Sequence, residues 1–427
     1  MNDIICLVDC NNMFASCELA FRPDLRGRPV VVLSSNDACC IARSYEAKAL
    51  GIKMAQPYFQ VRHFEKTKGL IAFSANFTLY TDMSQRIVSI LEKFSPDVSP
   101  YSIDESFCVL PSLNNMNLEH IGKQIRGAIL KQTGIGTGVG ISTTKTLAKL
   151  ANNAAKKFPK SGGVVDLVTD PNRRERMLAV MDINEVWGVG KALTAKLTAM
   201  GVNTALDLSK FGETAAKTQF SVVLARTVSE LNGIPAIPAD DTVVVNRQII
   251  ASRSYGEKIF DKETVFSSIV HHVSRGVKKL REQGAVAYSI SVTIGTNANS
   301  SIDKQYQNAG TCRTAVGSDD LKTFTELARK ALDQIWREGF PYAKSGITIN
   351  DITPKSNVQN DLFDLPTEPE DKKSEAVQSV IENINNRYGL GSAVVASHKQ
   401  GGDWQPKSEQ RSPAYTTSWA DIPIVKA

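Results

Sequence analysis

Three carboxylates stand where the neighbouring residues are mostly apolar. Asp9 follows the apolar run Ile4–Val8, and Asp104 and Glu105 lie between two further strand-like runs. Burying a charge is costly unless it is paired, solvated or bound to a metal ion. Carboxylate oxygens suit Mg²⁺, and two such ions about 4 Å apart can activate an attacking oxygen and stabilise a leaving one in phosphoryl transfer. Acids are also common at strand ends, so spacing alone leaves the two-metal interpretation open.

The elements that must position these acids alternate between strands and helices. Apolar runs predict strands at 4–8, 29–33, 98–102, 106–110 and 136–141, and helical spacing predicts helices at 12–19, 41–50, 78–94, 118–133 and 145–157. This order predicts an α+β sheet with helices on one face.

The second half of the chain contains further units. Residues 183–231 have helical spacing, and the Pro- and Gly-containing stretch 233–238 indicates a linker. A second α+β unit is predicted from Thr242, with strands at 242–245, 288–294 and 346–352 and helices at 263–283 and 321–338. After Thr353 the sequence turns polar, which indicates a tail with one helix near 375–386.

Composition bounds the class of protein. The length of 427 residues suggests two to four domains, and 42% hydrophobic with 22% charged residues argues against a disordered or fibrous chain. No apolar run approaches the ~18 residues of a membrane span, and the first residues do not resemble a secretory signal. The net charge of +6 is compatible with a polyanionic partner. Seven cysteines without a CxxC pair predict free, buried thiols in a reducing cytoplasm.

Two motifs place the acids in a specific context. The stretch 8–18, Val-Asp-Cys-Asn-Asn-Met-Phe-Ala-Ser-Cys-Glu, resembles the first motif of Y-family DNA polymerases, and Tyr-Ser-Ile-Asp-Glu at 101–105 resembles their second. The segments 41–48 and 138–149 also resemble that family, and 21–25, 48–52 and 80–84 narrow the resemblance to the UmuC branch, the catalytic subunits of bacterial DNA polymerase V. The agreement runs in order along the whole chain.

The resemblance implies a multidomain α+β fold shaped like a right hand. It implies a ferredoxin-like palm with small fingers in residues 1–165, the fingers being about 20–75, and a helical thumb with a helix-hairpin-helix in 166–240. An α+β little finger would occupy 241–352. A C-terminal tail, with a clamp-binding peptide and a UmuC-type C-terminal segment, would occupy 353–427.

The resemblance also implies roles for individual residues in the reaction. Two Mg²⁺ ions would be held by the catalytic carboxylates Asp9, Asp104 and Glu105 and by the backbone carbonyl of Cys10. Phe14, which stands where the UmuC branch usually has Tyr, would be the steric gate under the incoming sugar. The other implied nucleotide contacts are Cys39 and Ile41 over the templating base pair, and Tyr45, Lys48 and Lys156 at the triphosphate. From the residues alone, Phe14 is more simply a core aromatic, and Tyr45 and Lys48 a solvated helix face.

Basic residues predict a surface that faces DNA phosphates. Residues 142–163 contain five lysines and no acid, and the glycine turn at 187–191 resembles a helix-hairpin-helix, whose backbone N–H groups can hold a phosphate. The unit 242–350 carries 15 basic against 10 acidic residues. The residues predicted to contact DNA are Ser102, Lys145, Lys149, Gly188, Gly190, Lys191 and Arg253.

The tail contains two candidate partner-binding segments. Gln359, Leu362 and Phe363 resemble the short peptide that bacterial polymerases insert into the sliding clamp, where a Leu-Phe anchor fills an apolar pocket. Residues 412–423 resemble the C-terminal segment of UmuC proteins. There, Tyr415 and Trp419 either anchor a partner, such as the processed UmuD-like dimer, or cap the tail's own small fold.

These features together predict a cytoplasmic, error-prone DNA polymerase for translesion synthesis in the bacterial SOS response. Its expected partners are primer-template DNA, deoxynucleotides, the sliding clamp, the processed UmuD-like dimer and RecA, with no membrane. One alternative is another two-metal palm enzyme such as a nucleotide cyclase, which needs no DNA-binding surface. The other is a DNA-binding scaffold without catalysis, against which the presence of all three carboxylates argues.

Overall fold

The computed structural model describes residues 3–111, 117–237, 246–357, 376–377, 379–381, 383–385, 387–388, 392–393 and 404–424. The chain divides into two compact units, one of residues 1–240 with 409–427 and one of residues 241–408. The C-terminal residues are therefore shared between the two units and do not form a unit of their own. Over the described ranges, no helix has both the length and the apolar content that a membrane crossing requires.

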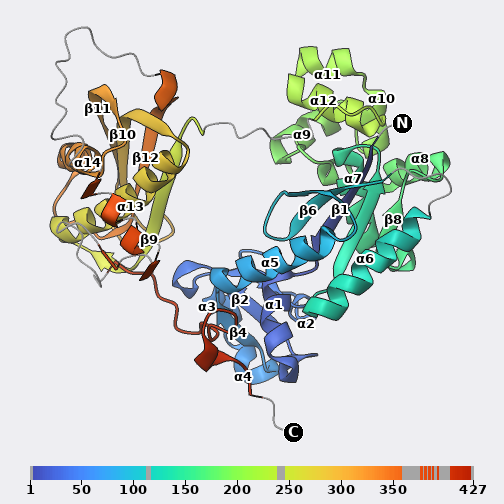
Figure 1. The fold of residues 1–427 in the computed structure, drawn as a ribbon, viewed down its shortest axis with the longest axis horizontal. Coiled ribbons are helices and arrows are strands. Elements are labelled where there is room, and N and C mark those ends of the chain that lie inside the picture. The colour runs from blue at the N-terminus through green and yellow to red at the C-terminus, as the bar shows by residue number, and fades with distance from the viewer. Residues whose placement is uncertain are drawn as a thin grey trace. The chain divides into compact units, whose positions relative to one another are not determined.

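A five-stranded sheet in the order β5-β6-β1-β7-β8 forms the centre of the first unit (Figure 1). Its strands are β1 (Ile4–Cys10), β5 (Asp97–Pro100), β6 (Glu105–Leu110), β7 (Thr137–Ser142) and β8 (Val164–Asp166). The central strand β1 pairs antiparallel with both β6 and β7, and β8 is added in parallel to β7. The order of the first four strands is the ferredoxin-like order, so this expectation for the palm is confirmed.

Helices cover both faces of this sheet, so the prediction of helices on one face was wrong. Cys6 and Val8 of β1 pack in the core that α5 (Phe77–Leu91) and α6 (Leu118–Thr133) close. Leu7 points the other way, because side chains alternate along a strand. It packs with Ala148 of α7 (Lys145–Lys157). The apolar spacing of the sequence led to this wrong prediction because α7 is as amphipathic as α5 and α6. Such spacing shows that a helix packs on a sheet, but it does not show which face of the sheet the helix covers.

The approach of α7 to the sheet depends on Gly140 in β7. A Cβ atom there would lie 2.1 Å from the carbonyl oxygen of Ala148 and 2.3 Å from the backbone nitrogen of Asn152. Only glycine permits such backbone contact. The side chain of Asn152 adds to it by donating to the Gly138 carbonyl at 2.8 Å. Gly140 therefore fixes the distance between the sheet and the lysines that α7 carries.

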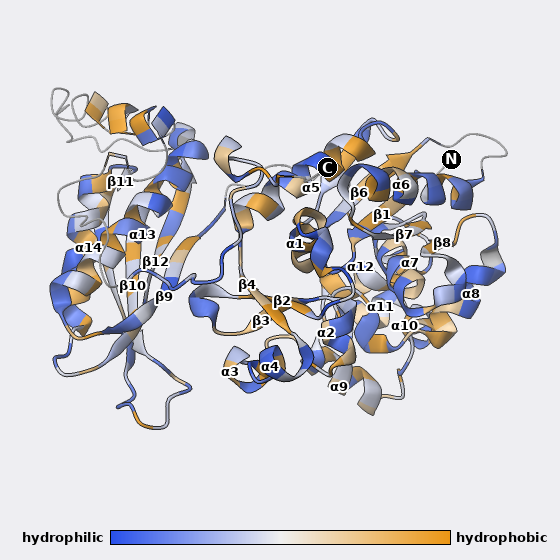
Figure 2. Cartoon of the chain, turned by 90° about the horizontal axis from the view of Figure 1, so that it is seen from below, coloured by the Kyte–Doolittle hydropathy of each residue, from blue (hydrophilic) through white to orange (hydrophobic). Residues whose placement is uncertain are grey.

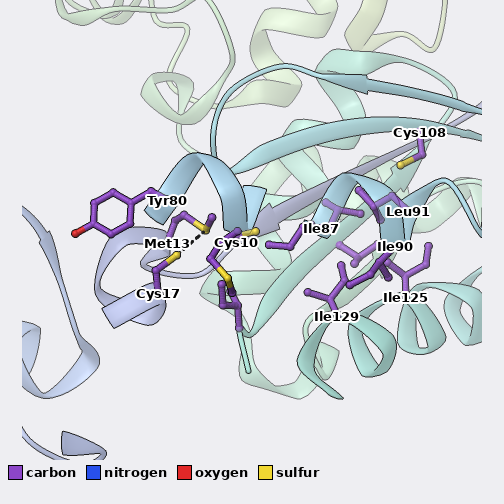
Figure 3. Close-up of a cluster of buried hydrophobic side chains, with 14 of the residues drawn as sticks. Cys10, Met13, Cys17, Tyr80, Ile87, Ile90, Leu91, Cys108, Ile125 and Ile129 are labelled. Atoms are coloured by element: carbon purple, nitrogen blue, oxygen red, sulfur yellow. Dashed lines mark hydrogen bonds between the residues drawn. The ribbon is translucent and has the colours of Figure 1, made fainter. Parts of the chain in front are cut away.

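The opposite face of the sheet is closed by aliphatic and sulfur side chains (Figure 3). Ile87 and Ile90 of α5 meet Ile125 and Ile129 of α6 beneath the sheet, all nearly inaccessible to solvent. Farther along the same core, Met13 and Cys17 of α1 (Met13–Phe21) join Cys10 of β1. All seven cysteines lie among the described residues and all are free thiols, as predicted, but Cys39 and Cys312 are only half-buried, so the prediction of burial was wrong for these two.

The region predicted to form the fingers contains a small three-stranded sheet in the order β3-β2-β4. Its strands are β2 (Val30–Leu33), β3 (Cys40–Arg43) and β4 (Ile71–Ser74), and its helices are α2 (Tyr45–Ala49), α3 (Tyr58–Val61) and α4 (Phe64–Lys68). Figure 2 shows hydrophobic residues along β2 and β4, where this sheet is buried.

The predicted helix at 41–50 was wrong over its first residues. Residues 41–43 belong to β3, which pairs antiparallel with β2. The helix α2 starts only after Ser44, whose Oγ accepts a hydrogen bond from the Ala47 N–H at 3.3 Å. Serine is a favoured N-cap, and this cap separates the strand from the helix.

A helical region completes the first unit, as the spacing of residues 183–231 predicts. Its helices are α8 (Pro171–Val180), α9 (Lys191–Ala199), α10 (Ala205–Lys210), α11 (Glu213–Gln219) and α12 (Val222–Leu231). Gly188, with φ of +87°, makes the turn before α9, and Gly201, with φ of +83°, follows its end. Among the described residues, the short 3₁₀ helices are Pro23–Leu25, Ser35–Asp37, Pro159–Ser161, Ile183–Glu185, Lys355–Asn357 and Trp419–Asp421.

The second unit is a four-stranded antiparallel sheet in the order β11-β10-β12-β9 with two long helices. Its elements are β9 (Ile249–Ile259), α13 (Lys262–Glu282), β10 (Ala285–Thr296), β11 (Gln307–Ser318), α14 (Leu321–Ile335) and β12 (Tyr342–Pro354). The strand β11 was not predicted, because its residues are small or polar and mostly exposed. The strand predicted at 242–245 lies outside the described residues.

Candidate active site

Two of the three candidate carboxylates face each other across adjacent strands. Asp9, near the end of β1, is the direct register partner of Glu105, the first residue of β6. One residue farther on, the Cys10 N–H donates to the Asp104 carbonyl at 2.8 Å. The antiparallel pairing therefore brings residues nearly 100 positions apart to one end of the sheet, as the sequence predicted for Asp9, Asp104 and Glu105.

Ser102 organises the turn that carries the other two acids. Its Oγ accepts the N–H of Asp104 at 3.3 Å and the N–H of Glu105 at 3.0 Å. The same hydroxyl donates to Asp104 Oδ1 at 2.5 Å. Ser102 was predicted as a DNA contact, and here its hydroxyl is engaged in holding the acidic turn.

Asp9 lies in an environment that disfavours its charge. Its side chain is nearly buried, with 8% of the residue exposed. The pKa of Asp9 is raised from 3.8 to about 6, chiefly by burial and less by the neighbouring Glu105, while Lys156 opposes the rise. Lys156 Nζ lies 2.5 Å from Asp9 Oδ2. The site therefore needs positive charge beside Asp9, and Lys156 supplies it in this structure.

Lys149 plays the matching role at Glu105. Its Nζ lies 2.8 Å from Glu105 Oε2. The same ammonium group lies over the ring of Tyr101, 4.5 Å from its centroid, and 5.4 Å from the centroid of the Trp187 ring. Such cation–π contacts hold a lysine in place. Each of the two facing carboxylates thus has its own lysine, and both lysines come from α7.

These contacts correct the prediction that five lysines in residues 142–163 lack counter-charges. Lys149 and Lys156 pair with Glu105 and Asp9, and Lys157 Nζ lies 3.1 Å from Glu185 Oε2. The acids come from distant parts of the chain, so the local sequence shows an imbalance that the fold removes. The predicted DNA contact of Lys149 and the predicted triphosphate contact of Lys156 stay predictions, and in this structure both ammonium groups are paired with acids.

The carboxylate oxygens of this site are of the chemical type that a hard divalent cation prefers. Asp9 and Glu105 come together and are neutralised by lysine ammonium groups, so a cation bound between them would meet the same need for positive charge. Over the part of the chain that the structure describes, no group of three or more His, Cys, Asp or Glu side chains is gathered closely enough to hold a metal ion. The Asp104 carboxylate is held by Ser102.

A cluster of basic side chains lies next to these acids. Lys48 Nζ lies over the ring of Tyr45, 5.5 Å from its centroid. Partial burial lowers the pKa of Lys48, and the positive charges of Arg43 and Lys156 lower it further. Tyr45 is 62% exposed and experiences the charge of Asp9. The predicted triphosphate contacts Tyr45, Lys48 and Lys156 therefore lie in one neighbourhood, whose repelling positive charges suit a polyanion.

Arg43 belongs to this cluster and was missed by sequence reasoning. It shares one face of β3 with Ile41, because the two are two residues apart on a strand. Its Nη1 donates to the Ile52 carbonyl at 2.9 Å, while its buried Nε has no hydrogen-bond partner among the described residues. The signal was present as an alternating Cys-Ile-Ala-Arg, but the stretch was predicted as a helix, which hid the shared face.

Phe14 lies in a group of aromatic rings on α1 and α5. Its ring is parallel to that of Tyr80, with centroids 4.5 Å apart and an interplanar angle of 12°. Phe77 meets it edge-on at 5.7 Å. The Phe14 ring is half-buried. Its role as a steric gate stays a prediction.

The remaining predicted site residues are more scattered. Cys39 forms an isolated bridge with Pro57, and Lys145 Nζ lies over the Phe107 ring at 5.5 Å. Gly190 is the N-cap of α9, and Lys191 is its first residue, after the Gly188 turn. Gln359, Leu362 and Phe363 lie outside the described residues.

Arg253, the predicted phosphate contact in the second unit, lies on the helix-covered face of β9. It shares that face with the buried Ile249 and Tyr255. Burial and the charge of Arg275 lower the pKa of Arg253. The open face of β9 instead presents residues such as Ser252 and Ser254, so a phosphate contact by Arg253 stays a prediction.

Comparisons with known proteins agree with this arrangement. Models of the impB/mucB/samB family and of its C-terminal domain match residues 8–153 and 246–362, and a domain of unknown function matches 375–425. ImpB of Salmonella typhimurium is 42% identical over 422 residues, which cover 98% of this chain and 99% of ImpB. UmuC of Salmonella typhimurium is 40% identical over the same length and coverage.

A solved structure gives the same fold. A Y-family DNA polymerase chimera superposes with a TM-score of 0.61 at 21% sequence identity, covering 82% of this chain and 99% of the chimera. At that identity the likeness shows the fold alone.

Proposed function

This chain belongs to the UmuC-like branch of the Y-family DNA polymerases, and we infer that it is an error-prone DNA-directed DNA polymerase of translesion synthesis in the bacterial SOS response. The observation that supports this most directly is the pairing of Asp9 with Glu105 across β1 and β6, with one lysine on each carboxylate. A polymerase needs such paired acids beside a basic nucleotide site.

We propose that Asp9, Asp104, Glu105 and the carbonyl of Cys10 hold two Mg²⁺ ions when substrates are present. When bound, these ions supply the positive charge that activates the primer 3′-oxygen and stabilises the departing pyrophosphate. Lys156 and Lys149 then no longer need to neutralise the two acids. This frees Lys156 for the triphosphate, together with the rest of the basic cluster.

The remaining roles follow the placement of the side chains. Lys48, Lys156, Tyr45 and Arg43 bind the triphosphate, for which lysine serves as a point charge. Phe14 closes the space that a 2′-hydroxyl would occupy. Cys39 and Ile41 lie over the templating base pair. Lys145, Lys149, Lys191, Arg253 and the glycine turn at 188–190 are proposed to hold DNA through contacts that do not depend on base sequence.

The proposed partners follow the family rather than the geometry. The enzyme acts in the cytoplasm on primer-template DNA with deoxynucleotides. Gln359, Leu362 and Phe363 bind the sliding clamp, and the processed UmuD-like dimer and RecA complete the active assembly. Trp419, which is 92% exposed near the C-terminus, is the more suitable partner anchor. Tyr415 instead stacks on Phe21 of the same chain at 4.8 Å.

Primer extension with the purified chain tests the proposal, with and without the clamp, the UmuD-like dimer and RecA. Asp104→Ala should abolish nucleotide addition while changing primer-template affinity by no more than a few-fold, because lysine and arginine side chains supply most of the DNA attraction. Asp97→Ala is the matched control, since Asp97 is an exposed acid on the neighbouring strand β5. It should keep wild-type activity.

The alternatives give different results. Template-independent formation of a cyclic nucleotide would identify the palm as a cyclase. DNA binding without addition of any nucleotide, under every condition, would identify a scaffold. Loss of DNA binding in parallel with activity in Asp104→Ala would mean that Asp104 supports the fold rather than the reaction.

A further inference from the structure

The C-terminal residues 409–424 are seated on the first unit by backbone hydrogen bonds. The Ser74 N–H donates to the Gln410 carbonyl at 3.0 Å, and the Gln410 N–H donates to Ser74 Oγ at 2.9 Å. Arg411 forms a parallel bridge with Ser74 at the end of the edge strand β4. The Glu409 N–H donates to Asp37 Oδ2 at 2.9 Å. Pairing an extended segment with a sheet edge fixes its register.

The pairing of the C-terminal segment with β4 buries Ser412 between α1 and the start of α5. Its Oγ donates to Glu18 Oε1 of α1 at 3.1 Å and accepts from Asn76 Nδ2 at 3.0 Å. Asn76 is the N-cap of α5, and its Oδ1 accepts the Leu79 N–H at 3.3 Å. One hydroxyl from the end of the chain therefore joins α1 to the start of α5.

Glu18 transmits this contact to an aromatic ring. The Glu18 side chain is fully buried, with 0% of the residue exposed. Its Oε1 also accepts the Tyr80 hydroxyl at 2.6 Å, whereas Oε2 has no partner among the described residues. Burial raises the pKa of Glu18, and the hydrogen bonds from Tyr80 and Ser412 oppose that rise. The carboxylate thus depends on two hydroxyl donors, of which Ser412 is one.

Tyr80 in turn supports the candidate sugar gate. Figure 3 shows Tyr80 at one end of the buried cluster, next to Met13 and Cys17. Its ring stacks on Phe14, so a shift of the phenol moves the surface on which Phe14 rests. Stacked rings hold each other by about 0.5–1.5 kcal/mol beyond their buried area.

We propose that Ser412 is a positioning residue for sugar selection, acting through Glu18 and Tyr80 on Phe14. Residues 375–425, which match a domain of unknown function, would then contribute to the accuracy of the site as well as to partner binding. The proposal rests on the polymerase function proposed above and on Phe14 as the gate. Ser412 touches no reacting group. Ser412 affects the position of the Phe14 ring.

Three variants of the full chain, assayed with its partner subunits, test this role. Ser412→Ala removes the hydroxyl, Ser412→Thr keeps it, and Thr417→Ala removes an exposed hydroxyl from the same segment. The measurement is kcat/KM for matched ribo- and deoxynucleotides. Ser412→Ala should lower discrimination against ribonucleotides at least about threefold, the lower range for coupled neighbours, with a smaller change in deoxynucleotide addition. Ser412→Thr and Thr417→Ala should keep wild-type discrimination.

Either of two results would overturn the proposal. Discrimination could remain unchanged in a folded Ser412→Ala protein, or both nucleotides could lose kcat/KM equally, as a merely structural role requires. Hydrogen exchange of the amides at 77–82 gives a readout without activity, and Ser412→Ala should accelerate it. If the wild type adds no deoxynucleotide at all, the polymerase function fails. Exchange then decides by itself whether Ser412 positions Tyr80, and unchanged exchange refutes it.

Discussion

Lys156 Nζ and Asp9 Oδ2 are 2.5 Å apart, so a residue proposed to bind the triphosphate is paired with a residue proposed to bind metal. In this structure the lysine neutralises a carboxylate whose pKa is raised by burial. Under the proposed function, a divalent cation would take over that task when substrate binds, and the lysine would then be free for phosphate.

The first prediction follows from this exchange of partners. Lys156→Ala should raise KM for deoxynucleotides roughly 10- to 100-fold, because a hydrogen bond to a charged group contributes about 1.5–3 kcal/mol. Lys157→Ala is the matched control, since Lys157 pairs with Glu185 instead. Steady-state kinetics on one primer-template measure both. Equal effects of the two substitutions would assign Lys156 to general DNA attraction.

A second prediction concerns the gate. Phe14→Ala should raise ribonucleotide incorporation at least roughly tenfold, since about 1.4 kcal/mol of lost exclusion is tenfold in selectivity. Deoxynucleotide addition should fall less. Phe59→Ala removes an exposed ring from α3 and should leave selectivity unchanged. If selectivity is unaltered in a folded Phe14→Ala protein, Phe14 is a core aromatic and the gate is another residue.

A third prediction is a loss of stability in weak acid. Burial, with smaller contributions from His271, Arg253 and Arg275, lowers the pKa of His272 on α13 to about 3. In the unfolded chain, histidine titrates near 6.5. Below that pH the unfolded state binds a proton that the folded state refuses, so the free energy of unfolding falls as the pH drops from about 6.5 towards 3. The expected slope is about 1.4 kcal/mol per pH unit.

Urea unfolding of the full chain at pH 7 and pH 5 measures this slope for the second unit. His272→Gln should flatten it, although the substitution also costs some stability at pH 7. His120→Gln, at an exposed position on α6, should leave the slope as in the wild type. A slope that persists in His272→Gln would have to come from other groups.

A fourth prediction concerns the peptide at 359–363. Leu362→Ala with Phe363→Ala should leave basal synthesis intact and remove stimulation by the sliding clamp. The reason is that these two apolar side chains are expected to fill a pocket of the clamp, and the double variant removes both. Primer extension with and without clamp measures this. A double variant that the clamp still stimulates as strongly as the wild type would show that the peptide is only a connection.

The sequence predicted the long, periodic elements well and the partners of side chains poorly. The helices α5, α6, α7 and α13 were predicted within a few residues, because apolar spacing over several turns is a local signal. Residues 41–43 were predicted as helix because their neighbours favour one, but pairing with β2 overrides that preference. Strand formation depends on such tertiary contacts more than on local propensity.

The same distinction explains the candidate site. The motifs placed Asp9 and Glu105 together, and the strand register agrees. No local pattern indicated that Lys149 and Lys156 would neutralise them, because the partners are 44 or more residues away. The hydrogen-bond partners of Ser412 could not be predicted from the sequence for the same reason. Its hydrogen-bond partner Glu18 is 394 positions earlier in the chain.

That separation has a consequence for the order in which the protein is made. Glu18 and Tyr80 leave the ribosome early, and Ser412 leaves it 394 residues after Glu18. At a synthesis rate of about 5–20 residues per second, the interval is roughly 20 to 80 s. From the synthesis of Glu105 to the end of that interval all three proposed catalytic acids exist, yet Glu18 lacks its second hydroxyl donor. A chain cut short in this period by premature termination would carry all three proposed catalytic acids, but the support beneath Phe14 would be incomplete.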